Sequence, residues 1–268
     1  MARDLISDGP VLLSLDGGVA HMTLNRPEAA NGMSVELLKA LYEAVMACHG
    51  EPDVRVLLLT GAGKNFCAGG DVQAFASKGE ALPDYIRPAT AYLQDSVLSL
   101  SRLQAPVIVA VQGFAAGGGG FGLVCAADLV IAAETAKFLA GATRVAMAPD
   151  GGTSANLPRL VGMRKAMEIL LTNPTIDAAE ALRLGLVNRV VPDAELHDAA
   201  LTLARELAAG APKALAATKR LLRSGAALTM ESCLSEEART VSELAGMADA
   251  REGLAAVIER RKPVFTGR

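Results

Sequence analysis

Two glycine-rich segments each follow a short apolar run, and both could hold an anion with backbone amides. The first, residues 66–71, contains Gly69 and Gly70, and the second is the glycine run 117–120. Glycine lets a ligand approach the backbone closely, and N–H groups at the start of a helix have no internal partner. Two such amides from different segments could converge on one oxygen and stabilise negative charge there. Taken alone, each segment is better explained as a tight turn.

The glycine run does not fit the common phosphate-binding motifs. No Gly-Lys-Ser/Thr follows residues 117–120, as a phosphate loop requires, and no suitable acidic residue follows the next strand, as a dinucleotide fingerprint requires. Spacing alone therefore predicts an anion site without identifying the anion.

One acidic residue, Asp150, lies in the turn-like sequence Ala-Pro-Asp-Gly-Gly at 148–152. The local sequence favours a turn in which the Asp150 side chain bonds backbone groups. The alternative is a general acid or base, whose pKa would be raised by apolar neighbours such as Ala142, Val145 and Met147.

The other polar residues have simpler explanations. We expect Asp71 to order its own loop and Asp128 to hold the start of a strand. None of the three histidines, His21, His49 and His197, is placed for catalysis.

The order of predicted elements favours an α/β class. Residues 11–25 predict a β-hairpin with a glycine turn, and Ser34 is expected to cap a helix that runs to about His49. A second helix is expected at 85–103, and a buried one at 121–127. Apolar runs predict buried strands at 54–60, 106–112 and 129–133. Beyond Pro192 the pattern is almost wholly helical, at 196–209, 212–224, 229–244 and 248–261.

Composition narrows the classes of function. The 268 residues are 51% hydrophobic and 21% charged, with no tryptophan, so the core must be built from Ala, Val, Leu and Ile. A net charge of −3 argues against a nucleic-acid partner. The four cysteines form no CxxC pair, which argues against a disulfide framework or a metal site. With no signal peptide and no membrane span apparent, we expect a cytoplasmic protein.

Taken together, these segments resemble the enoyl-CoA hydratase/isomerase (crotonase) superfamily. The matching segments occur in the family's order and cover nearly the whole chain: 25–27 with Asn31, 60–61, 66–71, 106–113, 117–120, 158–162 and 181–187. The resemblance implies a ββα spiral core at 1–195 that binds acyl-CoA, and a helical oligomerisation region at 196–268. It also implies a homotrimer or a dimer of trimers. No cofactor is implied, because coenzyme A is part of the substrate.

The family's two oxyanion amides map to Gly70 and Gly119. Counting from Gly113 gives Gly118 as the second amide, whereas counting back from Asp128 gives Gly119, and we prefer Gly119 because the following helix then continues without a gap. The resemblance places the acyl-CoA beside four further residues, which are Ala30, Ala68, Gly118 and Ala142.

The acid/base positions decide which reaction the resemblance implies. The two hydratase glutamates map to Gly122 and Ala142, which cannot transfer protons, so the two-glutamate hydration mechanism is not expected. Asp150 falls where some isomerases and a dehalogenase carry a functional aspartate. The predicted function is a cofactor-independent enoyl-CoA isomerase with Asp150, Gly70 and Gly119 as catalytic groups.

Three alternatives remain open. The chain could be a hydratase with an altered site, or a member that binds acyl-CoA without turnover. Residues 160–168 also resemble 4-chlorobenzoyl-CoA dehalogenase, but the histidine and tryptophan of that subfamily map to about Gln94 and to Ala142. The dehalogenase interpretation is therefore weak.

Overall fold

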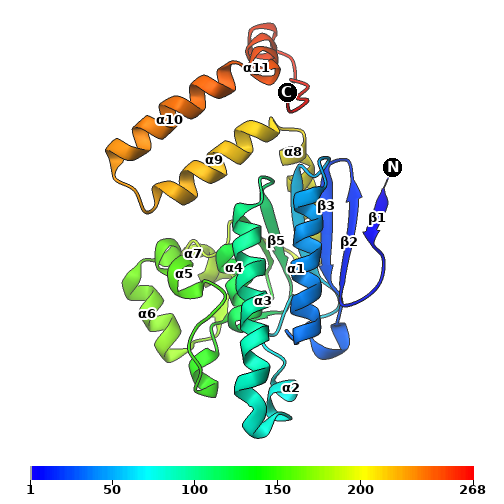
Figure 1. Cartoon of the computed structure of the whole chain (residues 1–268), viewed down its shortest axis with the longest axis vertical. Helices are drawn as coiled ribbons and strands as arrows, with labels where there is room; N and C mark the ends of the chain where they lie inside the picture. The colour runs from blue at the N-terminus through cyan, green and yellow to red at the C-terminus, as the bar shows by residue number, and fades with distance from the viewer. Residues whose placement is uncertain (1) are drawn as a thin grey trace.

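The computed structural model describes residues 2–268, and a seven-stranded sheet runs through its centre (Figure 1). The strands follow the order β1-β2-β3-β4-β5-β7-β10. Their bounds are β1 (Arg3–Ile6), β2 (Val11–Asp16), β3 (Val19–Leu24), β4 (Val56–Gly61), β5 (Val107–Val111), β7 (Leu129–Ala133) and β10 (Arg189–Val191).

The large sheet is antiparallel at one edge and parallel beyond it. β2 and β3 form the expected hairpin, and β1, which the sequence did not predict, pairs antiparallel with β2. From β3 onward every pair is parallel, so β4 and β5 end at the same edge of the sheet. The first glycine segment follows β4, and the glycine run 117–120 follows β5 by way of one short strand, so both are brought to one edge.

A smaller sheet completes the ββα pattern that the resemblance implied. β6 (Phe114–Ala116), β8 (Lys137–Leu139) and β9 (Ile176–Asp177) form it in the order β6-β8-β9. β5 and β6, which precede helix α4 (Gly117–Ala126), contribute one strand to each sheet, and so do β7 and β8. After β4 the chain adds only an isolated bridge, from Cys67 to Ala115, beside the smaller sheet. The expected α/β class with a crotonase-type core is confirmed.

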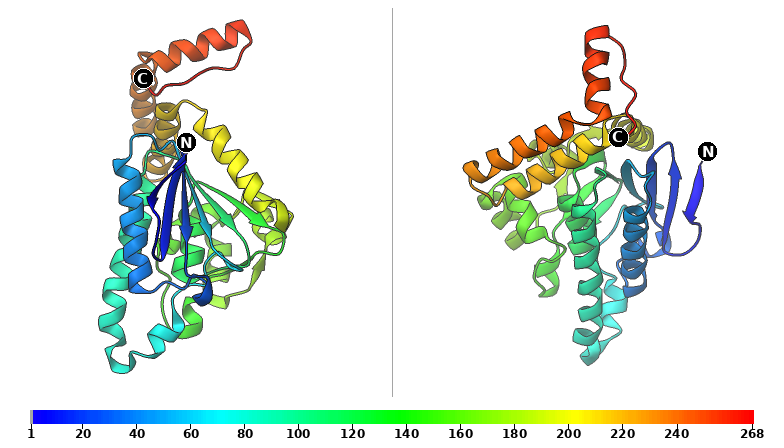
Figure 2. Two further views of the ribbon diagram at one scale, coloured as in Figure 1. Left: turned by 90° about the vertical axis from the view of Figure 1, so that its right-hand side faces the viewer. Right: turned by 45° about the horizontal axis from the view of Figure 1, so that its top comes forward.

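Alternating residues of the central strands face two helical layers. On one face, Leu57 and Leu59 of β4 pack in a core with helices α1 (Val35–Gly50) and α3 (Leu82–Arg102). On the other face, Leu58 packs against α8 (Leu196–Ala208). Figure 2 (left) shows α1 and α3 on one side of the strands and α8 on the other. This alternation is the period-2 pattern of a strand that is buried on both faces.

The α1–α3 layer holds all three tyrosines of the chain. The rings of Tyr42 on α1 and Tyr92 on α3 lie 6.5 Å apart between centroids, and Tyr85 meets Phe75 edge-on at 6.0 Å. Ser34 caps α1 as predicted, because its side chain accepts from the Leu37 amide at 3.3 Å.

The remaining helices surround this core or extend from it. They are α2 (Val72–Ala76), α5 (Thr153–Val161), α6 (Met163–Thr172), α7 (Ala178–Arg183), α9 (Pro212–Gly225), α10 (Met230–Ala245) and α11 (Ala248–Glu259). Short 3-10 turns lie at η1 (Pro27–Ala29), η2 (Gly79–Ala81), η3 (Ala142–Val145) and η4 (Asp193–Glu195). No helix within residues 2–268 is both long enough and apolar enough to cross a lipid bilayer.

The chain beyond residue 196 is helical, as the sequence predicted, but its helices differ in position. α8 packs on the large sheet, whereas α9, α10 and α11 lie beyond the end of the strands (Figures 1 and 2). The division into 1–195 and 196–268 stays a prediction.

A buried ion pair ties α9 to the core. Asp128 receives a hydrogen bond from the Val107 amide at 2.8 Å and pairs with Lys219 at 2.7 Å and Arg223 at 2.6 Å. Arg223 also donates to the Ala126 carbonyl at 2.7 Å, at the end of α4. Burial lowers the pKa of Lys219, and the adjacent Asp128 carboxylate opposes that shift. The prediction that Asp128 holds the start of a strand is confirmed.

Candidate active site

The two glycine segments touch each other at the edge of the sheet. A Cβ atom on Gly117 would lie 3.2 Å from the Cα of Gly69 and 3.6 Å from the amide nitrogen of Gly70. Both Gly69 and Gly117 have positive φ angles, +101° and +61°, which disfavour any side chain. The close approach therefore depends on glycine for space and for backbone conformation.

Backbone hydrogen bonds fix the first segment against its neighbours. The Cys67 amide donates to the Phe114 carbonyl at 3.0 Å, and the Ala116 amide donates to the Cys67 carbonyl at 2.9 Å. On the other side, the Met33 amide donates to the Gly69 carbonyl at 2.8 Å. The segment is thus held between β6 and the residues that precede α1.

The Gly70 amide makes no hydrogen bond within residues 2–268. Its neighbours on the second segment are the first amides of α4, which precede the helix's own hydrogen-bond ladder. The end of a helix that presents such amides carries partial positive charge. The two segments therefore offer unpaired donors beside one another, as an oxyanion site needs.

The structure corrects one expectation about this region. The helix was expected to begin at residue 121 after a glycine loop, but α4 begins at Gly117, so the glycine run forms its first turn. Packing explains the difference, because a Cβ on Gly120 would lie 2.2 Å from the Cys67 carbonyl oxygen. Tertiary contact outweighs the low helix propensity of glycine here.

Gly118 and Gly119 face different surroundings. A Cβ on Gly119 would lie 2.4 Å from the Met33 Cγ and 3.3 Å from the Cys67 Sγ, so this residue faces the core. Gly118 faces the other way, toward Asp150. Which of the two supplies the second oxyanion amide stays a prediction, with Gly119 preferred.

Asp150 lies directly over the first turn of α4. A Cβ on Gly118 would be 1.5 Å from the Asp150 Oδ1, so the carboxylate occupies the space that a side chain would fill. Its own backbone carbonyl accepts from the Thr153 amide at 3.0 Å, at the start of α5. The residue as a whole is exposed to solvent, yet the protein around its carboxyl displaces enough water to raise its pKa, while its backbone amide opposes the shift. No cation within residues 2–268 pairs with this carboxylate.

The four residues predicted to contact the acyl-CoA lie around the same segments. The Ala68 amide donates to the Ala30 carbonyl at 3.0 Å, and Ala30 has a left-handed φ of +51°. Ala142 begins η3, and a Cβ on its neighbour Gly141 would be 4.0 Å from the Gly117 amide nitrogen. Gly118 contacts Asp150, as described above. Their contacts with a substrate stay predictions.

Position 122 packs closely against the segment that carries Asp150. A Cβ on Gly122 would lie 3.2 Å from the Gly151 carbonyl oxygen and 3.3 Å from the Thr153 Oγ1. A side chain there would require these neighbours to shift by a few tenths of an ångström.

Asn31 has a positioning role that the sequence alone did not assign. It is fully buried, and its side chain donates to the carbonyls of Ala62 at 2.9 Å and Phe66 at 3.0 Å. Its Oδ1 accepts from the Arg26 amide at 2.8 Å. The only hint of this role in the sequence was a polar residue between a predicted strand and a predicted helix. The spacing of residues could not show which groups it bonds. Asn31 therefore anchors the loop that leads to the first glycine segment.

Other candidate groups have structural roles. Asp71 caps α2, because its Oδ1 accepts from the Ala74 amide at 3.0 Å, and it also pairs with Arg26 at 3.3 Å, so its expected ordering role is confirmed. Burial raises the pKa of the Cys67 thiol to about 12, which keeps it neutral at physiological pH. His21 hydrogen-bonds Thr60 at 3.1 Å on the sheet. Within residues 2–268, no three His, Cys, Asp or Glu side chains gather as metal ligands would.

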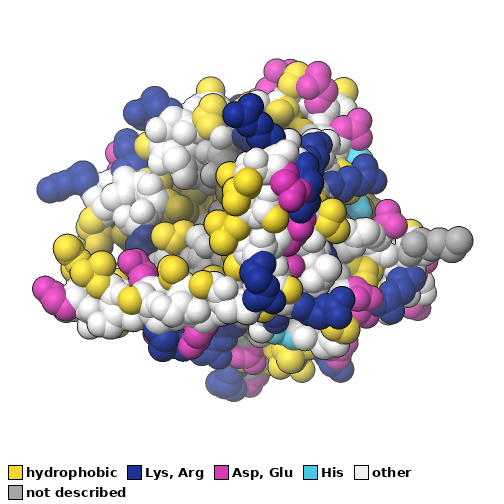
Figure 3. Space-filling model, turned by 90° about the horizontal axis from the view of Figure 1, so that it is seen from above, with side chains coloured by type: hydrophobic (Ala, Val, Ile, Leu, Met, Phe, Trp, Pro, Cys, Tyr) yellow, Lys and Arg dark blue, Asp and Glu magenta, His cyan; other side chains and the backbone are white. Residues whose placement is uncertain are grey.

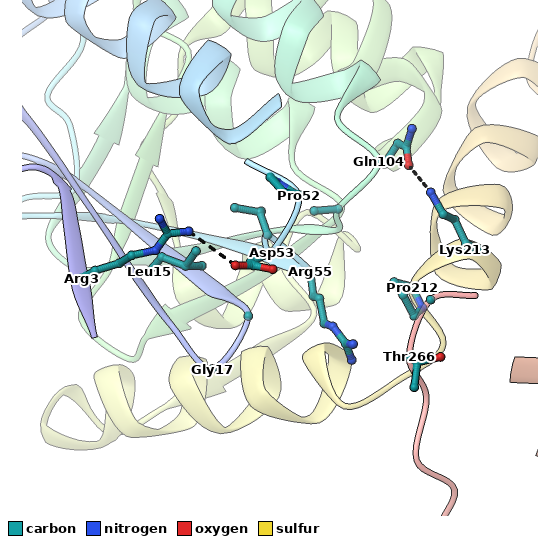
Figure 4. A pocket seen from close by; sticks show the side chains of 14 residues that line it. Arg3, Leu15, Gly17, Pro52, Asp53, Arg55, Gln104, Pro212, Lys213 and Thr266 are labelled. Carbon is teal, nitrogen blue, oxygen red and sulfur yellow. Dashed lines mark hydrogen bonds and ion pairs between the residues drawn. The ribbon is translucent and has the colours of Figure 1, made fainter. Parts of the chain in front are cut away.

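A polar pocket lies at the opposite end of the parallel strands (Figure 4). It is bordered by Arg55 just before β4, by Ala105 before β5 and by Lys213 at the start of α9. Arg3, labelled in the same view, pairs with Asp53 at 3.5 Å. Because this pocket lies at the ends where the strands begin, it is separate from the glycine segments.

Comparisons with known proteins agree with this geometry. The family model described as enoyl-CoA hydratase/isomerase matches residues 14–268. A 1,2-epoxyphenylacetyl-CoA isomerase from Escherichia coli (strain K12) is 37% identical over 96% of the chain and 98% of its own length. An (E)-benzylidenesuccinyl-CoA hydratase from Thauera aromatica is 38% identical over 96% of the chain and 99% of its own length. The crystal structure of an enoyl-CoA hydratase from Polaromonas sp. JS666 superimposes with a TM-score of 0.91 at 33% identity, covering 96% of the chain and all of that structure.

Proposed function

Because the chain belongs to the enoyl-CoA hydratase/isomerase family, which acts on CoA thioesters, we propose that it is an enoyl-CoA isomerase with Asp150 as its single acid/base. The observation that supports this proposal is the Asp150 carboxylate, which lies over the first turn of α4 with no cationic partner among residues 2–268. No cofactor is needed, because coenzyme A arrives as part of the substrate.

The proposed reaction moves a double bond in two proton transfers. The amides of Gly70 and Gly119 hold the thioester oxygen, and Asp150 removes a proton from the α- or γ-carbon. The electron pair left behind passes into an enolate, whose oxygen carries the negative charge. Asp150 then returns the proton to a different carbon, which shifts the double bond and regenerates the carboxylate. One aspartate therefore suffices for both steps.

Isomerisation is favoured over hydration by the residues at two positions. Gly122 and Ala142 stand where the resemblance places the hydratase glutamates, and neither can activate water. The segment that carries Asp150 also fills the space beside Gly122. Hydration remains the second candidate, because a relative named as a hydratase is as similar as the relative named as an isomerase.

A panel of CoA thioesters tests the proposed reaction. We expect turnover of a 3-enoyl-CoA or of an aromatic-ring epoxide thioester, with very slow hydration of crotonyl-CoA. Asp150→Asn is the control that assigns any turnover to this site. Hydration of crotonyl-CoA within tenfold of a two-glutamate hydratase, about 1.4 kcal/mol in the barrier, would overturn the proposal. Binding without turnover of any thioester would support a silent family member instead.

We also propose that the subunits form a trimer or a dimer of trimers through the C-terminal helices. Large apolar side chains are exposed on these helices and gather on the face seen in Figure 3. They include Leu222, Met230, Leu234, Val241, Leu254, Val257 and Ile258. Such an apolar surface is costly in a monomer and is typical of a subunit interface. Sedimentation at micromolar concentration tests this, and a stable monomer would overturn it.

A further inference from the structure

The Asp150 carboxylate occupies the space in which a side chain at position 118 would lie. A Cβ on Gly118 would be 1.5 Å from the Asp150 Oδ1, 2.4 Å from its Cγ and 2.9 Å from its Oδ2. Separations this short are overlaps of atoms, and only a movement of the Asp150 side chain or of the helix relieves them. A residue other than glycine at 118 therefore requires either the carboxylate or the helix to move.

The backbone around Asp150 rests on the same face of α4. A Cβ on Gly151 would lie 2.5 Å from the Gly118 carbonyl oxygen, and one on Gly122 would lie 3.2 Å from the Gly151 carbonyl oxygen. Gly118 and Gly122 are one helical turn apart, so they form a flat strip on one side of α4. The segment 149–152 docks on this strip.

The opposite side of α4 leaves the helix no room to withdraw. Gly119 faces Met33, and a Cβ on Gly120 would lie 2.2 Å from the Cys67 carbonyl oxygen. Cys67 is itself fixed by hydrogen bonds to β6. A methyl group at 118 would therefore displace Asp150 rather than the helix.

The backbone conformation does not explain glycine at this position. Gly118 lies inside α4 and is absent from the residues with positive φ, unlike Gly117 at +61°. Alanine adopts helical angles readily and is a better helix former than glycine. Space for the carboxylate is thus what glycine provides at 118.

We infer that Gly118 is the positioning residue for Asp150, because its missing side chain seats the carboxylate at the first turn of α4. The inference rests on the proposed function for its catalytic meaning. In that reaction the carboxylate gives up its negative charge when it takes the proton, while the enolate oxygen gains one at the same helix end. The partial positive charge of the helix terminus thus stabilises first the Asp150 carboxylate and then the enolate oxygen. A displaced carboxylate would lose this arrangement and its reach to the substrate carbon.

The test compares Gly118→Ala with Gly50→Ala in the full-length protein. Gly50 is also helical, and apart from its chain neighbours and its own helix no atom of residues 2–268 lies within 4 Å of the point where a Cβ would lie, so its variant should keep wild-type kcat. Gly118→Ala retains the backbone N–H, so we expect KM to change little while kcat falls about 10²-fold, as misplacement by an ångström does. Added to Asp150→Ala, which removes all three overlapping atoms, Gly118→Ala should have no further effect on rate. Wild-type kcat in Gly118→Ala, or a further loss in the double variant, would overturn the inference.

Carbon NMR measures the pKa of the Asp150 carboxyl and so tests the position of the carboxylate without substrate. Loss of the signal in Asp150→Asn assigns it. We expect the Asp150 pKa to fall toward its ordinary range in Gly118→Ala, because the displaced carboxylate enters water, and to stay unchanged in Gly50→Ala. An unchanged Asp150 pKa in Gly118→Ala would contradict the inference that Gly118 positions the carboxylate. If the wild type turns over no thioester while this pKa still shifts in Gly118→Ala, the proposed function is wrong, but Gly118 still positions the Asp150 carboxylate. If Gly118→Ala does not fold, recovery of folding in Gly118→Ala/Asp150→Ala supports the overlap, and failure to recover contradicts it.

Discussion

Two aspartates lie at opposite ends of α4 and have contrasting surroundings. Asp128 follows the last turn and is held by Lys219, Arg223 and the Val107 amide. Asp150 lies over the first turn and has no cationic partner within residues 2–268. A carboxylate whose lone pairs are committed to cations holds structure together. One without such partners is free to exchange a proton, so the partners distinguish the two roles.

The largest expected effect is on turnover at the unpaired aspartate. Asp150→Asn keeps the size of the side chain but removes the proton acceptor, so isomerase kcat should fall by roughly 10²–10⁴. Acyl-CoA binding should survive, because the amides of Gly70 and Gly119 are unchanged. Steady-state kinetics and calorimetric titration with a substrate analogue check both statements. Full activity in this variant would remove Asp150 from the mechanism.

The same substitution at the paired aspartate should act on stability instead. Asp128→Asn leaves Lys219 and Arg223 without their counter-charge, which should lower the free energy of unfolding by about 3 kcal/mol. Denaturant unfolding measures this loss. Asp84→Asn is the matched control, since its ion pair with Arg87 is exposed and should contribute at most about 1 kcal/mol. Equal losses in the two variants would contradict the structural role of Asp128.

The pH dependence of the rate should report Asp150 alone. Burial raises its pKa, and the carboxylate must be ionised to accept a proton, so kcat should fall as pH drops through that raised pKa. The acidic limb should therefore lie at higher pH than an ordinary aspartate would give. A pH–rate profile locates this limb, and a limb in the ordinary aspartate range would show that burial does not shift the working base.

The smallest expected effect is the contribution of Asp150 to the folding stability of the protein. Because the pKa of Asp150 is higher in the folded chain than in the unfolded one, its ionised form opposes folding at pH values above the unfolded pKa. Asp150→Asn should thus raise stability slightly at neutral pH, by less than about 0.5 kcal/mol for a side chain that water reaches. The gain should vanish at low pH, where both forms are neutral. Thermal melts at two pH values measure the change in stability of Asp150→Asn, whose sign should be opposite to that of the loss expected in Asp128→Asn.

Local signals in the sequence predicted elements whose causes are local. The glycine turn between β2 and β3 and the Ser34 cap of α1 depend on a few neighbouring residues, and both were predicted correctly. The first turn of α4 was not, because glycine has low helix propensity and the contact with Cys67 that stabilises it comes from a distant segment. β1 carries little apolar pattern and depends on pairing with β2.

The candidate site was predicted only in its parts. The glycine segments and Asp150 were recognised, but spacing could not show that Asp150 rests on Gly118, since that contact depends on how α4 and the start of α5 pack. The resemblance supplied the register that made Asp150 a candidate. It did not show that the backbone of Gly151 packs closely against Gly122, which the structure does.

The absence of tryptophan gives the chain an optical signal from one layer only. Tyr42, Tyr85 and Tyr92 all lie on α1 or α3, and Phe75, against which Tyr85 packs, lies over Gly70. Ultraviolet emission therefore follows the α1–α3 layer beside the first glycine segment and does not sense α8 to α11. Far-ultraviolet circular dichroism follows all helices. Melting curves from the two signals would coincide if the helices beyond residue 196 unfold together with the core, and would separate if they unfold alone.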